Sequence, residues 1–186
     1  MPPKVKITKE DIIQAAVNIV RTSGDQAINA RTVAAALQCS TQPVFSNFAT
    51  MEELRLAVVR QADKLCQEYM HREMEGGAYP PYKASGMAYI RFAKEERELF
   101  KLLYMRDRSN EVLPLEMEVT DEMTAIIHNA TGMDNAAAEL FHLEMWAYVH
   151  GIATMFATGF LDLEWPLVSK MLTDAYQGLV KQHMGA

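Results

Sequence analysis

The chain has 186 residues, of which 49% are hydrophobic and 23% charged, and its formal net charge is −6. This length and composition are typical of a globular protein of one or two domains, and they exclude a disordered chain and a large multidomain enzyme. No apolar run approaches the roughly 20 residues of a membrane helix, and the N-terminus lacks the apolar core of a signal peptide, so we expect no membrane association. Two cysteines, Cys39 and Cys66, make no disulfide framework, which favours a reduced, cytoplasmic protein.

The first two predicted helices are marked by their capping residues. Thr8, with Asp11 three residues later, forms a variant of the capping box and predicts a helix over about 9–23. Gly24 is expected to end this helix in a left-handed conformation. Asn29 can accept hydrogen bonds from the first turn of a short second helix, so we expect that helix to begin directly after it.

A third short helix and a long fourth helix follow. Ser40 is expected to cap the third helix, over about 41–47. Thr50 and Glu53 form a full capping box, which predicts a helix over about 50–75 that ends at a pair of glycines. At about 1.5 Å per residue this helix is about 38 Å long, enough to connect the first three helices with the rest of the chain.

The rest of the sequence predicts five more helices, separated at glycine and proline. Gly76–Pro81 is the clearest break, Pro114 suits a first helical turn, and Asp134 is expected to cap a long helix. The expected helices span about 82–94, 96–105, 114–130, 135–158 and 165–183. The sequence has neither a repeat nor a strand pattern, so we expect an all-α protein of about nine helices.

The second and third predicted helices, joined by a short turn, have the arrangement of a helix-turn-helix. The second helix of this motif, here the predicted helix over about 41–47, places its N-terminal side chains in the DNA major groove. The side chains available for this are Thr41, Gln42, Ser46 and Asn47, which can pair with adenine edges or contact phosphates and thymine methyl groups. A small helical subdomain with a polar outer face is the alternative. Residues 1–65 carry a net charge of +2 against −8 for the rest, which favours phosphate contact at one end.

Two segments of the N-terminal third resemble the tetracycline-repressor (TetR) family. Leu37–Leu54, with the sequence LQCSTQPVFSNFATMEEL, is similar to the family's helix-turn-helix motif, and Ile12–Gly24 is similar to its first helix. The resemblance implies a helix-turn-helix DNA-binding domain over 1–48, followed by a ligand-binding and dimerisation domain over 49–186. It also implies a repressor, with neither enzymatic activity nor a cofactor, that binds a double-stranded palindromic operator as a homodimer and releases it on binding a small apolar effector.

The family pattern assigns further residues to DNA. Arg31 stands at a position that commonly reaches DNA, with a solvated surface residue as the alternative, and Lys4 and Lys6 suit a flexible arm on the phosphates. Two residues depart from the pattern, because Phe45 replaces a tyrosine and Met51 replaces a lysine, both of which usually contact phosphates. Each lost cationic contact lowers the salt dependence of DNA affinity by a slope of about 0.9 and weakens binding.

The later part of the chain resembles the family's regulatory domains with a Trp-x-x-x-His-Gly signature, here Trp146–Gly151. In that arrangement Met and aromatic side chains surround a central cavity, and such side chains suit an adaptable apolar pocket. The predicted effector-binding residues are Phe92, Phe100, Tyr104, Met105, Met123, Trp146, His150 and Met155. A core position is the alternative for each of them, and for His150 that alternative includes a hydrogen bond to a backbone carbonyl.

Two helix faces predict a homodimer, which the resemblance also implies. A stripe of small residues on one helix allows another helix to approach closely, and apolar spacings of three and four residues on the last helix form a bundle seam. The predicted interface residues are Ala147, Gly151, Thr154, Thr158, Val168, Leu172, Ala175 and Leu179. Packing of both stripes within the monomer is the alternative.

A di-iron carboxylate enzyme in a helical bundle is the alternative class of protein. Glu68 with His71, and Glu139 with His142, each place a carboxylate and an imidazole on one helical face. Such a site also needs one glutamate from each of two further helices. Glu118 or Glu122 could supply one of them, whereas the early helices place no acid on an apolar face. We therefore expect no metal site.

Overall fold

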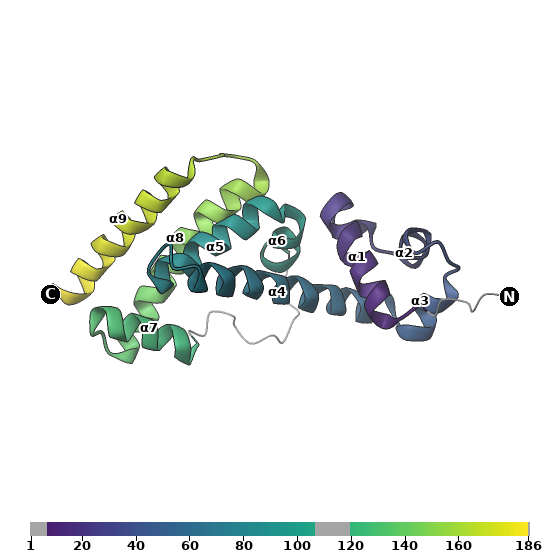
Figure 1. The fold of residues 1–186 in the computed structure, drawn as a ribbon, viewed down its shortest axis with the longest axis horizontal. Helices are drawn as coiled ribbons and strands as arrows, with labels where there is room; N and C mark the ends of the chain where they lie inside the picture. The colour runs from purple at the N-terminus through teal and green to yellow at the C-terminus, as the bar shows by residue number, and fades with distance from the viewer. Residues whose placement is uncertain (1–6, 107–119, 186) are drawn as a thin grey trace. The chain divides into compact units, whose positions relative to one another are not determined.

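The computed structural model describes residues 7–106 and 120–185, and these residues form nine α-helices, one short 3-10 helix and no strand (Figure 1). The helices are α1 (Lys9–Ser23), α2 (Ala30–Ala36), α3 (Gln42–Asn47), α4 (Met51–Glu75), α5 (Pro81–Glu95), α6 (Arg97–Tyr104), α7 (Asp121–Thr131), α8 (Asn135–Thr158) and α9 (Trp165–Met184), and the 3-10 helix η1 spans Asp25–Ala27. The predicted all-α class is confirmed. In the described part of the chain, no helix is both long enough and apolar enough to cross a membrane.

Capping side chains begin several helices as predicted. The hydroxyl oxygen of Thr8 accepts the backbone N–H of Asp11 at 3.1 Å, and the Asp11 carboxylate accepts the N–H of Thr8 at 2.9 Å. Asn29 and Asp134 likewise accept N–H groups in the first turns of α2 and α8. These bonds satisfy donors that have no partner inside a helix. Gly24 ends α1 with φ 77° and ψ 170°, which is a positive-φ but extended conformation and not the left-handed helical one that we expected.

Two predicted helix starts need correction. α3 begins at Gln42, so Ser40 lies outside it, and no side chain caps this helix. The turn before α3 contains Gln38 with φ 52°, a left-handed conformation that ends α2. α7 begins at Asp121, where a threonine hydroxyl caps it, and the predicted start at Pro114 lies outside the described residues.

The chain divides into two compact units. The first unit comprises Met1–Cys66 and Glu96–Arg106, and the second comprises Gln67–Glu95 and Asp107–Ala186. α4 therefore contributes residues to both units, and α6 belongs to the first unit although it follows α5 in the sequence. The division of the sequence into domains after residue 48 stays a prediction.

The core of the first unit is built on one face of α1, which packs against α2, α3 and α6. The buried residues of this face are Ile12, Ala16, Val17 and Val20. Val44 of α3 and the following Phe48 are also fully buried. Arg21 donates from Nε and Nη2 to the two carboxylate oxygens of Glu96, each at 2.8 Å, and this bidentate pair joins α1 to the residue that precedes α6.

The second unit is built around α5, which packs against α7, α8 and α9. Gly86 lies where α5 comes close to two helices, since a Cβ atom at this position would be 3.4 Å from Val149 Cγ2 and 3.5 Å from Leu172 Cδ1. A separate cluster joins α7 to α8 and contains Ile127, Met133, Ala138, Phe141 and Met145. α5 and α8 therefore both contribute buried residues to the core of the second unit.

Candidate DNA interface and effector region

α3 presents a polar and aromatic face to solvent within the first unit. Gln42, Phe45 and Ser46 are exposed and share one side of the helix, because positions three and four apart are neighbours on a helix. Val44 and Phe48 are buried on the opposite side. The core therefore holds α3 by one face and leaves the other face available to a partner.

Two of the four side chains predicted to read DNA are already hydrogen-bonded to the backbone. Nδ2 of Asn47 donates to the carbonyl of Pro43 at 2.8 Å, and the Ser46 hydroxyl donates to the carbonyl of Gln42 at 2.9 Å. Thr41 and Asn47 are half-buried. The exposed amide of Gln42 has no hydrogen-bond partner among the described residues, so both its donor and its acceptor are available.

A carboxylate of α4 fixes the turn that follows α3. Glu53 accepts the backbone N–H of Ala49 at 2.9 Å and Nζ of Lys9 at 3.1 Å. The bond from Ala49, followed by that from Lys9, lowers the pKa of Glu53 from its ordinary value. The predicted capping box forms in one direction only, because Thr50 Oγ1 accepts the N–H of Glu53 at 3.1 Å while the Glu53 carboxylate bonds the N–H of Ala49.

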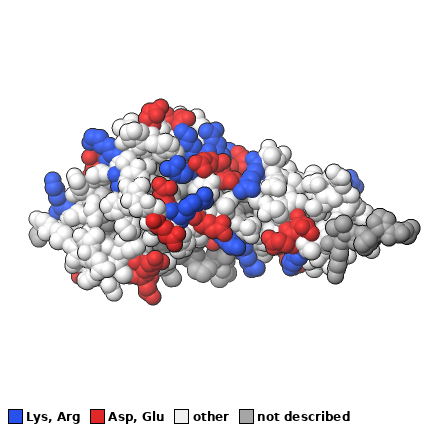
Figure 2. Space-filling view, viewed as in Figure 1, with Lys and Arg blue, Asp and Glu red and all other residues white. Residues whose placement is uncertain are grey.

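Arg31 is exposed in the first turn of α2 and forms no ion pair with the described residues. The sequence has no charged residue between Arg31 and Glu52, so α3 and the turns on both sides of it are uncharged. In Figure 2 the surface over α2 is largely free of charge, whereas acidic and basic side chains lie side by side around α5. Lys94 at the end of α5 forms an ion pair with Asp162, with 2.6 Å between Nζ and Oδ1. Lys4 and Lys6, the predicted arm on the phosphates, lie outside the described residues.

The predicted effector-binding residues divide between the two units. The first unit contains Phe100, Tyr104 and Met105, and the second contains Phe92, Met123, Trp146, His150 and Met155. Phe92 and Phe100 are fully buried, whereas Met105 is 42% exposed. The second unit brings Trp146 and His150 together as stacked rings, with centroids 4.8 Å apart and an interplanar angle of 15°.

Two tyrosines of α5 that the sequence-based prediction did not include lie against histidines of α8. The hydroxyl of Tyr89 is 3.0 Å from Nδ1 of His150, and that of Tyr82 is 3.0 Å from Nδ1 of His142. Burial lowers the pKa of both histidines, and it raises the pKa of Tyr82, with a smaller contribution from Tyr176. Burial therefore favours the neutral imidazole in both histidines, and in Tyr82 it also favours the protonated phenol.

The residues predicted for a dimer interface differ in exposure. Ala147, Gly151 and Thr158 are exposed, Thr154, Ala175 and Leu179 are half-buried, and Val168 and Leu172 are buried in the core of the second unit. α8 and α9 also carry exposed apolar side chains, namely Leu140, Leu143, Tyr148 and Leu167. Both helices therefore carry small or apolar side chains that are exposed to solvent.

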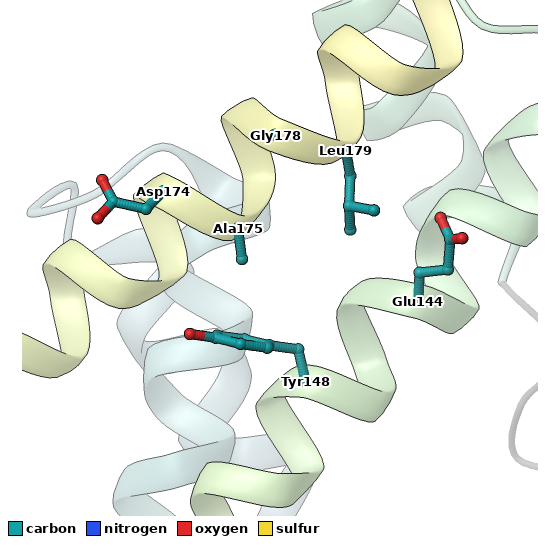
Figure 3. A pocket seen from close by; sticks show the side chains of 6 residues that line it. All are labelled: Glu144, Tyr148, Asp174, Ala175, Gly178 and Leu179. Carbon is teal, nitrogen blue, oxygen red and sulfur yellow. The ribbon is translucent and has the colours of Figure 1, made fainter.

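An open groove of about 380 Å³ lies between α8 and α9 (Figure 3). It is lined by Glu144, Tyr148, Asp174, Ala175, Gly178 and Leu179. Figure 3 shows the Tyr148 ring and the Leu179 side chain turned into the space between the helices, with the Asp174 carboxylate turned away. The groove is therefore mainly apolar, with the Glu144 carboxylate at one end, where His183 Nε2 lies 2.7 Å from it.

The geometry does not favour a di-iron site. Within the described residues, no three His, Cys, Asp or Glu side chains come close enough to hold a metal ion. Glu68 and His71 are exposed on α4, Glu139 is exposed on α8, and the His142 ring nitrogen is engaged by Tyr82.

The helical fold and the exposed face of α3 define a protein of the helix-turn-helix class, and the comparisons give its family. The family profile described as "Tetracyclin repressor-like, C-terminal domain" matches residues 82–175, just over half of the chain. The chain therefore belongs to the TetR family of DNA-binding transcriptional regulators. No match was found among curated proteins.

Solved structures of the same fold cover nearly the whole chain. A TetR-like transcriptional regulator from Rhodococcus sp. RHA1 is 14% identical over 99% of this chain and 96% of its own, with a TM-score of 0.62. A TetR family member from Streptomyces coelicolor A3 is 18% identical over 90% and 96%, with a TM-score of 0.63. The multidrug binding protein EbrR, complexed with imidazole, is 19% identical over 90% and 88%, with a TM-score of 0.61. Because the identities are low, these likenesses concern the fold.

Proposed function

We propose that this regulator is a homodimeric repressor, which binds a palindromic operator and releases it when a small apolar effector binds. The observation that carries the proposal is the exposed face of α3, where the Gln42 amide has no hydrogen-bond partner among the described residues while Val44 and Phe48 anchor the opposite face. Because no charge lies on this face, it is suited to base edges, and phosphate contacts must come from residues outside α3, such as Arg31.

The proposed dimer interface is the exposed region of α8 and α9. Apart from Gly151, its chain neighbours and the nearby backbone of α8, no atom lies within 4 Å of the place where a Cβ at this position would lie, so a helix of a second copy can approach closely. Leu140 and Leu143 supply exposed apolar area on α8, and Leu167 supplies it on α9. A two-fold dimer presents two α3 helices, which explains why the operator is proposed to be a palindrome with half-sites about 34–36 Å apart or more.

The proposed effector region is the aromatic cluster of the second unit around Trp146, His150 and Tyr89. Stacked rings with a hydrogen-bonded imidazole offer an apolar surface and one polar group, as small-molecule sites commonly do. The likeness in fold to EbrR, a multidrug binding protein complexed with imidazole, supports a small organic effector. A cytoplasmic location is part of the proposal, since neither Cys39 nor Cys66 forms a disulfide.

Release requires that the effector bind more tightly to a dimer that does not fit the operator. α4 is the proposed connection, because its residues up to Cys66 belong to the first unit and those from Gln67 to the second. A coupling free energy of about 1–3 kcal/mol would lower operator affinity roughly 5- to 150-fold.

Selection of bound duplexes from a random DNA pool tests the regulator directly. We expect the full-length protein to enrich a near-palindromic sequence, and a footprint on that duplex to cover both half-sites symmetrically. Enrichment of no sequence over the starting pool would contradict the proposal of a sequence-specific operator. Enrichment of a single, non-repeated site would contradict the two-fold arrangement.

Effector control is tested with the selected duplex and tryptophan fluorescence. The chain has two tryptophans, and Trp165→Phe leaves Trp146 as the only reporter. We expect an apolar ligand to quench Trp146 and to weaken operator binding over the same concentration range. A ligand that saturates the Trp146 signal while operator affinity stays constant is not an inducer, and it would contradict coupling through α4.

A further inference from the structure

α3 carries one large apolar side chain that is not part of the core of the first unit. Phe45 is 57% exposed and lies on the outer face of α3, three residues after Gln42. Single exposed apolar residues are common on protein surfaces and carry no meaning by themselves. The position of Phe45 is informative, because it is the face that a helix-turn-helix turns toward the major groove.

The base edges in the major groove carry one group that a phenyl ring can contact favourably. Of the groups on the base edges, only the C5-methyl group of thymine is apolar, and apolar side chains recognise it by contact. A phenyl ring has no hydrogen-bonding group for a phosphate oxygen. No charged residue lies between Arg31 and Glu52 in the sequence, so α3 itself also brings no cation to the backbone.

The hydrogen bonds of the other polar side chains of α3 indicate which of them is available to contact a base. Ser46 and Asn47 already donate to backbone carbonyls of α3, whereas the Gln42 amide has no hydrogen-bond partner among the described residues. Glutamine pairs with the N6 and N7 edge of adenine through two hydrogen bonds. Gln42 and Phe45 are separated by about 4.5 Å along the helix axis, close to the roughly 3.4 Å between base pairs, so they reach the same or adjacent base pairs.

We propose that Phe45 contacts a thymine C5-methyl group and that Gln42 pairs with an adenine edge, so each half-site has A·T pairs where α3 enters the major groove. The assignment rests on the proposed function, because it names the bases that the α3 face reads. It gives a role to Phe45, which stands where the family usually has a tyrosine that contacts a phosphate. The replacement thus exchanges a backbone contact for a base contact.

The test uses the duplex that the full-length protein selects from random DNA. Each thymine of one half-site is replaced in turn by deoxyuridine, which lacks only the C5-methyl group, and binding is measured by fluorescence anisotropy at constant salt. For the contacted thymine we expect roughly fourfold weaker binding, as follows from the burial of one methyl-sized group. Deoxyuridine outside the half-sites is the control and is expected to change nothing.

Combining the base change with a protein change assigns the contact to Phe45. With Phe45→Ala, the same deoxyuridine is expected to have no further effect, because the ring that met the methyl group is gone. Leu56→Ala is the matched control, since Leu56 is an exposed apolar residue of the first unit outside α3, at 41% exposure, and it should keep the deoxyuridine penalty. For Gln42, replacing the paired adenine by 7-deazaadenine should weaken the unmodified protein and leave Gln42→Ala unaffected.

The outcomes separate this inference from the proposed function. If a sequence is selected but deoxyuridine has no effect at any thymine of the half-site, or if its penalty persists in Phe45→Ala, the assignment to Phe45 is overturned while the regulator itself stands. A penalty from 7-deazaadenine that persists in Gln42→Ala overturns the assignment to Gln42. If no sequence is selected, the proposed function fails and the inference fails with it.

Discussion

Arg31 and Glu53 are both charged residues near helix starts in the first unit, but their surroundings are opposite. Glu53 is held by the backbone N–H of Ala49 and by Lys9, so its charge is used within the unit. Arg31 is exposed and forms no ion pair with the described residues. An exposed guanidinium without an acidic partner can bind a phosphate or a guanine edge without first breaking an ion pair.

We predict that Arg31→Ala weakens operator binding by about 1–3 kcal/mol, because it removes a charged contact to DNA. If that contact is to a phosphate, the slope of log affinity against log salt also falls by about 0.9. Anisotropy titrations at several salt concentrations measure both quantities. Arg60→Ala, an exposed arginine on α4, is the control. Unchanged affinity and slope in Arg31→Ala would remove this residue from the interface.

We predict that the second unit loses stability in mild acid. His142 and His150 have folded-state pKa values below their ordinary value of 6.5, mainly because of burial. At a pH between the folded-state and unfolded-state pKa values, the unfolded chain binds more protons than the folded one. The free energy of unfolding therefore falls as the pH decreases through 6.5 toward the folded-state pKa. Above 6.5 the contribution of the two histidines to stability is fully present. Urea unfolding over this pH range measures the change.

His142→Gln is the variant that isolates this effect. The glutamine amide can still accept a hydrogen bond from Tyr82 but does not titrate. We expect a smaller loss of stability between neutral and mildly acidic pH than in the unmodified protein. An equal loss in both proteins would show that other groups cause the pH dependence.

At the scale of elements, the sequence alone predicts a helix end correctly where residues close together in the chain determine it. Thr8, Asn29 and Asp134 cap helices as predicted, because capping depends on residues within three positions of each other. The predicted start of α3 is wrong by one residue. We assigned the cap to Ser40, whereas the residue directly before the helix is Thr41, which has a helical backbone conformation and makes no side-chain capping bond. The 3-10 helix η1 was missed, because three residues have no periodicity to recognise.

The candidate site was less predictable, because it depends on the packing of distant segments. Trp146 and His150 are four residues apart on one helix, and their stacking follows from helical spacing. The contact of His150 with Tyr89 joins residues 61 positions apart, and no local pattern indicates the register of α5 against α8. Val168 and Leu172 fit a seam by spacing, but spacing alone does not say whether the seam faces the monomer core or a partner.

We predict that Gly86→Leu lowers the free energy of unfolding by about 1–3 kcal/mol, because a large side chain overpacks the contact of α5 with Val149 and Leu172. Gly86→Ala is the control. Its Cβ would sit at ordinary contact distance from these two residues, and alanine is the better helix former, so we expect a change of less than about 1 kcal/mol. Chemical denaturation of both variants measures the free energy of unfolding. Equal stability of the two would contradict close packing at Gly86.

At the scale of the whole molecule, we predict a dimer of twice the 21.0 kDa chain mass and its loss in Gly151→Leu. The position has open space around it within the chain, so a leucine leaves the fold intact but blocks the close approach of a second copy. Light scattering gives the mass and circular dichroism the helical content. Ala125→Leu, an exposed site on α7, should stay dimeric. A monomeric unmodified protein would contradict the interface on α8 and α9.

The two tyrosine–histidine pairs have a consequence for the electrostatics of the second unit. Tyr82 and Tyr89 meet His142 and His150 in the same order, so α5 and α8 run parallel. Parallel helices bring the negative ends of their macrodipoles together, which is unfavourable unless positive charge collects there. α8 has no basic residue in its last turn, but Lys94, in the last turn of α5, lies 5.1 Å from the centre of the Phe156 ring near the end of α8. α9 begins at the same place, since Trp165 stacks on Phe156, and the positive end of its dipole offsets the two negative ends together with Lys94, whose charge is shared with Asp162.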